Sequence, residues 1–489
     1  MIEKLTLFPN IQHLLSRIRD GEPLTMRQQL VLTIQLSLPA IFAQLSTILM
    51  QYVDASMLGR LGANASAAVG LVASATWLVG GMSMSLTVGF TVQVAHRIGA
   101  KRFSDARNIM RQAFIVAFLF IMSISIPSMI ISHHLPYWLG GGDEICGDAG
   151  DYFFIYALAL PAMQMYSIAG GMLRCSGNMH VPSVASIVMC VLDVILNIFL
   201  IFPTREVDIA GCQFVIYGAD LGVRGAALAT ALAELVTALF LMFYLLTRSR
   251  ELAIFGKRNN HDVLMRGRSR SFLPTRATLK EAFRIGFPMG IEHIVMCSAQ
   301  VISTIIVAPL GVMSIAANSF AVTAESLCYM PGYGIGDAAT TLIGQSIGAK
   351  RRDLTRRFAF MSVGLGMFIM SLMGVVMYFC APLMMSILSP VEEIRDLGVM
   401  ALRIEAWAEP MFAASIVAYG VFVGAGDTLV PCGMNFLSMW GVRLTLAASL
   451  APVMGLRGAW LAMCIELCFR GLIFLVRLFG RRWMRRIEV

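Results

Sequence analysis

The sequence predicts an all-α polytopic membrane protein with twelve transmembrane helices in two six-helix, pseudo-symmetric lobes. Hydrophobic residues make up 57% of the 489 residues and charged residues only 14%, with a mean hydropathy of +0.74. Ordinary globular domains contain about 25% charged residues. Apolar stretches of about 20 residues, the length that crosses a bilayer as a helix, recur along the whole chain. The chain also repeats itself at a fixed offset of 249 residues.

Hydropathy places the expected helices one after another, separated by short polar loops. The twelve predicted spans are residues 31–53, 67–95, 113–132, 151–173, 183–202, 225–247, 285–307, 314–346, 358–380, 397–423, 430–450 and 456–478.

The repeat indicates a duplicated fold, because self-similarity at a fixed offset is the sequence mark of repeated architecture. The run IGAK occurs at 98–101 and again at 347–350. From residue 222 onward the offset becomes 233, so the first half carries about 16 extra residues around 204–221. Since six is even, both copies enter the membrane in the same orientation. They should then be related by an axis along the membrane normal, as in some secondary transporters.

Charge patterning predicts the orientation and the domain limits. Basic residues gather in alternate loops and the intervening loops are acidic or neutral, which is the positive-inside pattern and puts both termini in the cytoplasm. We therefore expect a multi-pass protein of a bacterial cytoplasmic (inner) membrane. Its expected segments are an N-terminal cytoplasmic segment, a first lobe, a cytoplasmic linker, a second lobe and a basic tail, at residues 1–30, 31–247, 248–280, 281–478 and 479–489.

Two carboxylates of the first half lie inside predicted spans and have no acidic counterpart in the second half. Asp54 pairs with Ser303 at the offset of 249, and Asp193 pairs with Val442. A charged side chain at bilayer depth costs about 2.5–3.5 kcal/mol on insertion scales, so such residues are functional hypotheses by default. Identical residues at paired positions should be scaffold, and unpaired charges are the better candidates for chemistry.

Neutral oxygen donors accompany these carboxylates. Asn197 follows Asp193 by one helical turn on the same face, and Thr230 lies in the sixth span. Asp54, Asp193 and Asn197 supply the oxygen ligands that a hard cation such as Na⁺ requires. Carboxylates brought together in a low dielectric also bind protons readily. The alternative is structural: Asp54 at the membrane interface, and Asp193 in a helix–helix hydrogen bond.

The second half carries its own acidic residues inside predicted spans. A negatively lined cavity would suit an organic cation. The alternative is structural pairing, for example with Arg403 or Arg443. The acidic residues are Glu292, Glu325, Asp337, Glu405 and Glu409.

The motifs of other function classes are missing or uninformative. The chain has no GxxxxGK[ST] phosphate loop, no HExxH and no CxxC spacing, so direct ATP use, zinc chemistry and a disulfide framework lack support. The GxGD of intramembrane aspartyl proteases occurs at 334–337, but it also occurs at 140–143 and 424–427 without a partner Tyr-Asp pair. We expect no enzyme activity and no cofactor other than a coupling ion.

Several segments together resemble the multidrug and toxic compound extrusion (MATE) family, in the branch similar to DNA-damage-inducible bacterial members. They cover most of the chain from about residue 30 to residue 480. The segments are VDASMLGRLG, RIGAKRFSDAR, MLRCSGNMHVP with its twin VFVGAGDTLVP, GVRGAALAT, and the stretch from APLGVMSIAANSF to LIGQSIGAK.

The resemblance implies twelve helices in two lobes around a V-shaped central cavity. The family's first-helix aspartate matches Asp54, and its sixth-helix threonine matches Thr230. The family's fifth helix has Asn followed four residues later by Asp, whereas here Asp193 comes before Asn197, which moves the charge by about 6 Å along the helix. A glutamate that some members use in the seventh span would fall at Met296; Glu292 lies one turn earlier.

The expected function is a secondary active multidrug efflux antiporter, which exports organic cations or amphiphiles in exchange for Na⁺ or H⁺ by alternating access. Coupling is assigned to the first-half residues and substrate binding to the second-half acids. The alternative is a flippase for a lipid-linked precursor, whose cavity should be lined with cationic side chains. We expect the partners to be small molecules and the lipid bilayer, with no nucleic acid, and the protein to be a monomer.

Overall fold

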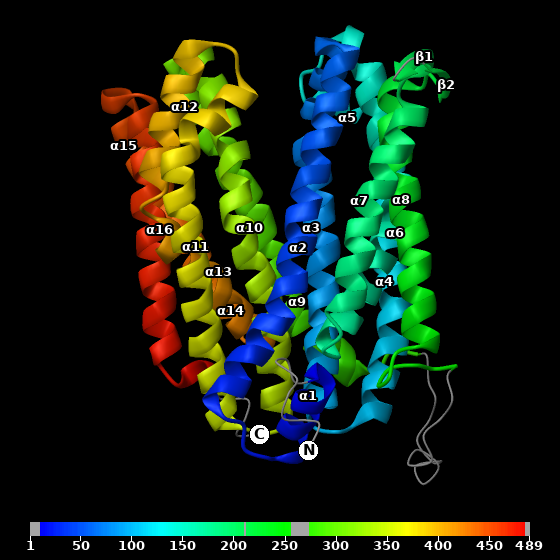
Figure 1. Ribbon diagram of the computed structural model, residues 1–489, viewed down its shortest axis with the longest axis vertical. Coiled ribbons are helices and arrows are strands. Elements are labelled where there is room, and N and C mark those ends of the chain that lie inside the picture. Colours follow the sequence, from blue (N-terminus) through cyan, green and yellow to red (C-terminus); the bar gives the residue numbers. More distant parts are fainter. Residues whose placement is uncertain (1–9, 210–211, 256–272, 485–489) are drawn as a thin grey trace.

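A computed structural model describes residues 10–255, apart from 210–211, and residues 273–484. Within these ranges the chain is built almost entirely of helices (Figure 1). In the first half the helices are α1 (Ile11–Asp20), α2 (Met26–Leu61), α3 (Ala63–Gly99), α4 (Phe103–Ile131), α5 (Leu135–Trp138), α6 (Asp143–Cys175), α7 (His180–Leu200) and α8 (Gly222–Thr247). In the second half they are α9 (Arg276–Val307), η3 (Ala308–Leu310), α10 (Val312–Gly348), α11 (Arg352–Leu388), α12 (Glu392–Glu405), α13 (Glu409–Gly424), α14 (Leu429–Phe436), η4 (Leu437–Leu444), α15 (Thr445–Met454) and α16 (Leu456–Phe479).

Most of these helices are long and apolar enough to cross a membrane. Ten spans meet both criteria in the described residues, and an eleventh is formed by α12 and α13 together, which are bent by 62° at a short break. The tenth predicted span, 397–423, is therefore a broken helix rather than a continuous one. The eleventh, 430–450, is interrupted by the π-helical segment η4, which carries Arg443. α10 is 37 residues long but contains Glu325, Pro331 and Asp337.

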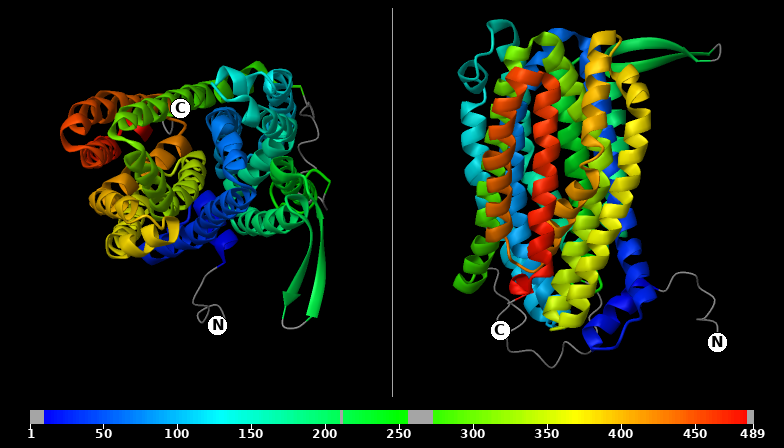
Figure 2. Two further views of the ribbon diagram at one scale, coloured as in Figure 1. Left: turned by 90° about the horizontal axis from the view of Figure 1, so that it is seen from above. Right: turned by 90° about the vertical axis from the view of Figure 1, so that its left-hand side faces the viewer.

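One element departs from the all-α prediction. β1 (Pro203–Ile209) and β2 (Cys212–Ala219) form an antiparallel hairpin where the first half carries its extra residues. The insertion was predicted from the change of offset, but its strand structure was not. Figure 2 shows the hairpin projecting sideways from one end of the bundle, which we call the hairpin end. α1 lies at the opposite end, the α1 end (Figure 1).

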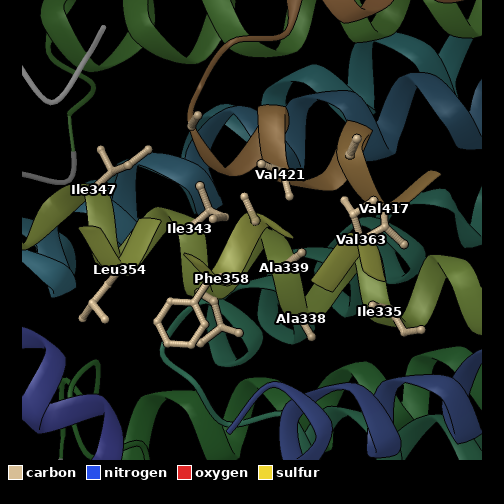
Figure 3. Packing of buried hydrophobic residues seen from close by; sticks show 14 of the residues in the cluster. Ile335, Ala338, Ala339, Ile343, Ile347, Leu354, Phe358, Val363, Val417 and Val421 are labelled. Carbon is tan, nitrogen blue, oxygen red and sulfur yellow. The ribbon is translucent and has the colours of Figure 1, made fainter. Parts of the chain in front are cut away.

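The helices pack into two groups that correspond to the two halves of the chain. In the first group α3, α4, α6 and α8 share one buried apolar cluster, which includes Phe90, Met110 and Leu241. In the second group α10, α11 and α13 pack through aliphatic and aromatic side chains such as Ile335, Phe358 and Val417 (Figure 3). Burying such side chains away from lipid and water gives each group close, specific packing.

Helix α2 belongs to both groups. Leu32 and Leu36, near its beginning, are buried in the apolar cluster of the second group. Further along, Asp54 meets α7 of the first group. Pro39 lies within α2 and removes a backbone donor between these two parts. A change around Asp54 can therefore reach the second group along a single helix.

The two groups touch closely at the α1 end. The imidazole Nε2 of His96 lies 2.9 Å from the carbonyl oxygen of Gly424, and the amide of Gln345 donates to the carbonyl oxygen of Cys175 at 2.9 Å. His96 and Gln345 are 249 residues apart, as are Cys175 and Gly424. The two contacts are thus equivalent members of the duplication, and we call them the paired latches.

Candidate functional site

The structure brings the four predicted coupling residues of the first half together. The Asn197 side-chain amide donates to Asp54 Oδ1 at 2.7 Å and to Asp193 Oδ2 at 3.0 Å. The hydroxyl of Thr230, on α8, donates to the carbonyl oxygen of Ala226 at 3.2 Å, and its side chain lies close to Asp193. α2, α7 and α8 each contribute at least one side chain. We call Asp54, Asp193, Asn197 and Thr230 the first-lobe acidic site.

This site is buried but incompletely satisfied. Asp193 and Asn197 have no exposed surface, and Asp54 is partly exposed. In the described residues Asp193 Oδ1 and Asn197 Oδ1 receive no hydrogen bond. A buried oxygen without a donor is costly, so a proton or a small cation that engages these two oxygens would stabilise the site.

Two residues that the sequence did not assign to this site lie near it. Glu234 lies one turn after Thr230 on α8, and the charge of Asp193 acts on it. Tyr152, on α6, lies close enough to Asp54, Asp193 and Glu234 for their charges to act on its hydroxyl group. The i to i+4 spacing from Thr230 could have revealed Glu234. Nothing in the sequence distinguishes Tyr152 from the neighbouring aromatic residues.

A separate cavity of about 850 Å³ lies between the two groups of helices. α3 and α6 line it from the first group, and α9, α10, α13, η4 and α16 line it from the second. The lining is mostly apolar and includes aromatic side chains such as Trp77, Tyr329 and Tyr419. A cavity of this size with an apolar, aromatic wall and a few polar groups is typical of a small-molecule site. The residues of the first-lobe acidic site do not line it.

Glu292 is the cavity carboxylate with the most complete set of neutral donors. Tyr419 donates to Glu292 Oε2 at 2.6 Å and Cys432 donates to the same oxygen at 2.8 Å. The Asn435 amide donates to Oε1. Since all three donors are uncharged, Glu292 can hold a negative charge that faces the cavity without a protein cation beside it.

The other predicted cavity acids are placed differently. Asp337 lines the cavity and lies near Arg174 and Gln44. Glu325 also lines the cavity and lies close enough to Arg443 for the guanidinium charge to act on it, but the two form no ion pair within 4 Å.

Glu405, by contrast, does not line the cavity; it lies behind Glu325, fully buried. The other suggested partner, Arg403, instead packs over the ring of Tyr378.

The cavity also contains cationic side chains that the sequence analysis did not assign. Arg174, Arg443 and Arg470 all line it. Arg470 forms an ion pair with Glu466 at 2.6 Å, and Ser438 donates to the same carboxylate oxygen at 2.5 Å. Each of these arginines therefore has an acidic neighbour: Asp337 for Arg174, Glu325 for Arg443 and Glu466 for Arg470.

The duplication is also visible in comparisons with known proteins. A family model described as MatE matches the chain twice, at residues 39–199 and 288–448. This chain belongs to the MatE family. The two matches are displaced by the same 249 residues as the internal repeat, so each half contains one family unit. The resemblance noted from the sequence segments is confirmed, and MatE-family membership makes the chain a membrane transporter rather than an enzyme.

Curated relatives are similar along nearly their whole length. A probable multidrug resistance protein NorM from Thermotoga maritima is 24% identical over 458 residues, which cover 93% of each chain. A probable multidrug resistance protein NorM from Brucella suis is 26% identical over 477 residues, which cover 94% of each chain.

Solved structures share the fold of this MatE-family chain. An outward-facing multidrug resistance MATE transporter superposes with a TM-score of 0.84 at 20% identity, covering 98% of this chain and 99% of that one. A transporter from Pyrococcus furiosus, described as having a binding pocket of reverse polarity that suggests a different function, superposes with a TM-score of 0.83 at 20% identity, covering 97% and 98%.

Proposed function

We propose that this MatE-family chain is a secondary active multidrug efflux antiporter, which exports organic cations and amphiphiles by alternating access in exchange for H⁺ or Na⁺. The observation that carries the proposal is the separation of two sites. The first-lobe acidic site holds two carboxyls around one amide, and the cavity between the lobes holds Glu292 against an aromatic wall. The names of the NorM relatives support multidrug export.

The proposed membrane arrangement has twelve spans. To the eleven that length and composition identify we add α10, which is as long as α11 and packs between the other helices. The basic loops after α3 and α10 lie at the α1 end, so the positive-inside rule assigns this end to the cytoplasm. The location would then be a bacterial inner membrane, with the paired latches closing the cytoplasmic side.

In this mechanism the coupling cation acts on the equilibrium between lobe arrangements. A cation bound among Asp54, Asp193 and Asn197 neutralises part of the buried charge, and α2 carries the resulting change from α7 to the second lobe. A cation moving down the membrane potential contributes about 2.3 kcal/mol per charge per 100 mV. Moving a two-state equilibrium from 1:99 to 99:1 requires about 5.5 kcal/mol, so the ion and its concentration gradient together are of the right size.

Vesicle transport tests the proposal. The purified protein is reconstituted into proteoliposomes, which are loaded with ethidium or norfloxacin. A Na⁺ gradient and a pH gradient are then imposed in separate experiments. We expect one gradient to drive export, and Asp54→Asn and Asp193→Asn to slow it at least about tenfold. The matched control is Asp148→Asn, an exposed position near the beginning of α6. Normal export by both variants would refute the first-lobe site. If neither gradient drove export of any cation but an anionic lipid-linked precursor crossed the bilayer, the flippase alternative would replace the antiporter.

A further inference from the structure

A second group of carboxyls lies in the second lobe, away from the first-lobe acidic site and from Glu292. Glu405 is the last residue of α12 and Glu409 is the first residue of α13, so both lie at the 62° break of this span. Glu325, on α10, lies beside them. We call Glu325, Glu405 and Glu409 the second-lobe carboxyl cluster. Broken helices are a recurrent location for ion sites in transporters.

The two glutamates at the break are buried without donors. Glu405 and Glu409 have no exposed surface, and none of their four carboxyl oxygens receives a hydrogen bond from an N–H or O–H group of the described residues. The group within reach of Glu405 is another carboxyl, that of Glu325. An ionised carboxylate only accepts hydrogen bonds, so two carboxyls can pair only when one of them carries a proton.

The surrounding charges do not neutralise this cluster. Arg443 of η4 is the cation whose charge acts on Glu325 and Glu405. On α16, Glu466 also acts on Glu405 but is paired with Arg470. The other titratable neighbours are thiol and phenol groups: Cys328, Tyr329 and Tyr333 on α10 and Cys464 on α16. α11 places Gly374 and the methionines 370 and 377 on this side.

The cluster of three carboxyls therefore has one guanidinium near it, whose charge acts on two of them, Glu325 and Glu405. Glu405 also lies at the C-terminus of α12, where the helix macrodipole disfavours an anion. Burying the excess negative charge without partners would cost several kcal/mol per ion. Bound protons remove this cost with no further ligand.

The internal repeat shows that these acids are additions to the scaffold. At the offset of 249, Glu405 corresponds to Tyr156 and Glu325 to Thr76. In the first lobe Tyr156 donates to the backbone carbonyl of Thr76 at 2.8 Å. The second lobe keeps the same helix–helix contact but replaces a neutral pair with two carboxyls. α6 is continuous at this level, whereas its counterpart is broken.

The second-lobe carboxyl cluster has a route to the substrate. Glu325 and Arg443 line the central cavity, while Glu405 and Glu409 lie behind Glu325. On the other side, the hydroxyl of Tyr52 donates to the carbonyl of Thr323. Tyr52 lies within one helical turn of Asp54, and Thr323 lies within one turn of Glu325. This hydrogen bond, within the packed interface between α2 and α10, lies between the two acidic regions.

We propose that Glu325, Glu405 and Glu409 form a second proton-binding site, which exchanges protons with the central cavity through Glu325. In the context of the proposed antiport, this site adds to the coupling at the first-lobe acidic site, and the two are linked through the contact between Tyr52 and Thr323. A cationic substrate that arrives in the cavity beside Glu325 would favour release of a proton from the cluster.

Infrared spectroscopy tests the site without requiring transport. The full-length protein in lipid is titrated with acid while the band of protonated carboxyl groups is recorded. We expect Glu405→Gln and Glu409→Gln each to remove part of the band, because glutamine has the shape of a protonated glutamate but cannot titrate. Glu325→Gln should keep the part of the band that comes from Glu405 and Glu409. The response of that part to a pH jump should become about tenfold slower, since Glu325 is the proposed route for protons between the cavity and these two residues. Glu393→Gln, an exposed residue on the same helix α12, is the matched control.

Transport supplies the second measurement. In proteoliposomes the double variant Glu405→Gln/Glu409→Gln should take up about half as many protons per exported ethidium as the unmodified protein. A band that survives intact in the double variant, or an unchanged proton count, would overturn the proposal. If the unmodified protein exported nothing under any gradient, the antiport function would fail, but the infrared result would still decide whether the cluster binds protons.

Discussion

At the scale of single residues, the buried carboxyls differ in the number of groups that donate to them. Glu292 accepts from three neutral donors, and Asp54 and Asp193 share the single amide of Asn197. Glu405 and Glu409 accept from none in the described residues. A carboxyl with many donors is stable as an anion, whereas one with few is stable only when a proton or cation arrives. In the proposed antiport, this ranking assigns Glu292 to substrate binding and Asp54, Asp193, Glu405 and Glu409 to coupling.

The ranking predicts a specific loss for Glu292→Gln. The neutral amide keeps the shape of the side chain but removes the anion that faces the cavity, and charge-assisted interactions contribute about 1.5–3 kcal/mol. Affinity for a permanent cation such as ethidium should fall at least about tenfold, while an uncharged amphiphile should bind nearly unchanged. Equilibrium binding to the purified protein measures both. Equal weakening of both ligands would mean that the substitution disturbed the cavity rather than a cation site.

The sequence predicts part of this residue-level picture. Asp54 and Asp193 stand out because their repeat partners are not acidic, and the four-residue spacing places Asn197 beside Asp193. The donors to Glu292 could not be predicted, since Tyr419, Cys432 and Asn435 come from different helices more than 120 residues away. Their meeting depends on how α9 packs against α13 and α14, which hydropathy does not encode.

At the scale of elements, the closure of the α1 end depends on the approach of α3 and α10. Gly99 and Gly348 are equivalent positions of the repeat, and each lies against the backbone of the other helix. A β-carbon on Gly99 would overlap the carbonyl of Gln345, and one on Gly348 would overlap the carbonyl of His96. Glycine at both positions therefore permits a backbone-to-backbone contact between the lobes.

Gly99→Ala should consequently destabilise the closed α1 end, although alanine is the better helix former by about 1 kcal/mol. Gly364→Ala, at an exposed helical position of α11 with open space around it, is the control and should be neutral or slightly stabilising. Thermal unfolding in detergent should show a lower midpoint for Gly99→Ala only. A raised midpoint for both variants would mean that α3 and α10 do not need this close contact.

Element boundaries show which signals the sequence carries. Uniform apolar stretches predicted spans such as 225–247, and α8 covers Gly222–Thr247. The break after Glu405 was not predicted, because the charged residues there interrupt neither the apolar period nor the length of the span. η4 was not predicted either, since a π-helical segment forms through tertiary packing against α9 and α16 rather than through local preference.

At the scale of the whole molecule, the duplication gives the transporter a nearly symmetric contact between its lobes and acidic sites that are not symmetric. The paired latches follow the repeat: His96 to Gly424 and Gln345 to Cys175. The first-lobe acidic site and the second-lobe carboxyl cluster instead occupy positions that do not correspond to each other. In the proposed antiport, a symmetric closure opens and shuts with the same lobe motion, while cations bound at the unequal acidic sites bias that motion in one direction.

The paired latches make a prediction about the whole molecule. Each is a hydrogen bond to a carbonyl, with a net contribution of about 1 kcal/mol, so losing one should change the ratio of closed to open α1 ends about fivefold. Because the latches are equivalent, His96→Ala and Gln345→Ala should shift this ratio to a similar extent, and the double variant should shift it further.

Spin labels measure this ratio through the distance between the lobes. They are attached, in a cysteine-replaced background, at the exposed positions 102 and 357, near the beginnings of α4 and α11. If one variant opened the α1 end and the other left the distance unchanged, closure would depend on one lobe's contact alone. The repeat would then describe the ancestry of the fold rather than the way in which it closes.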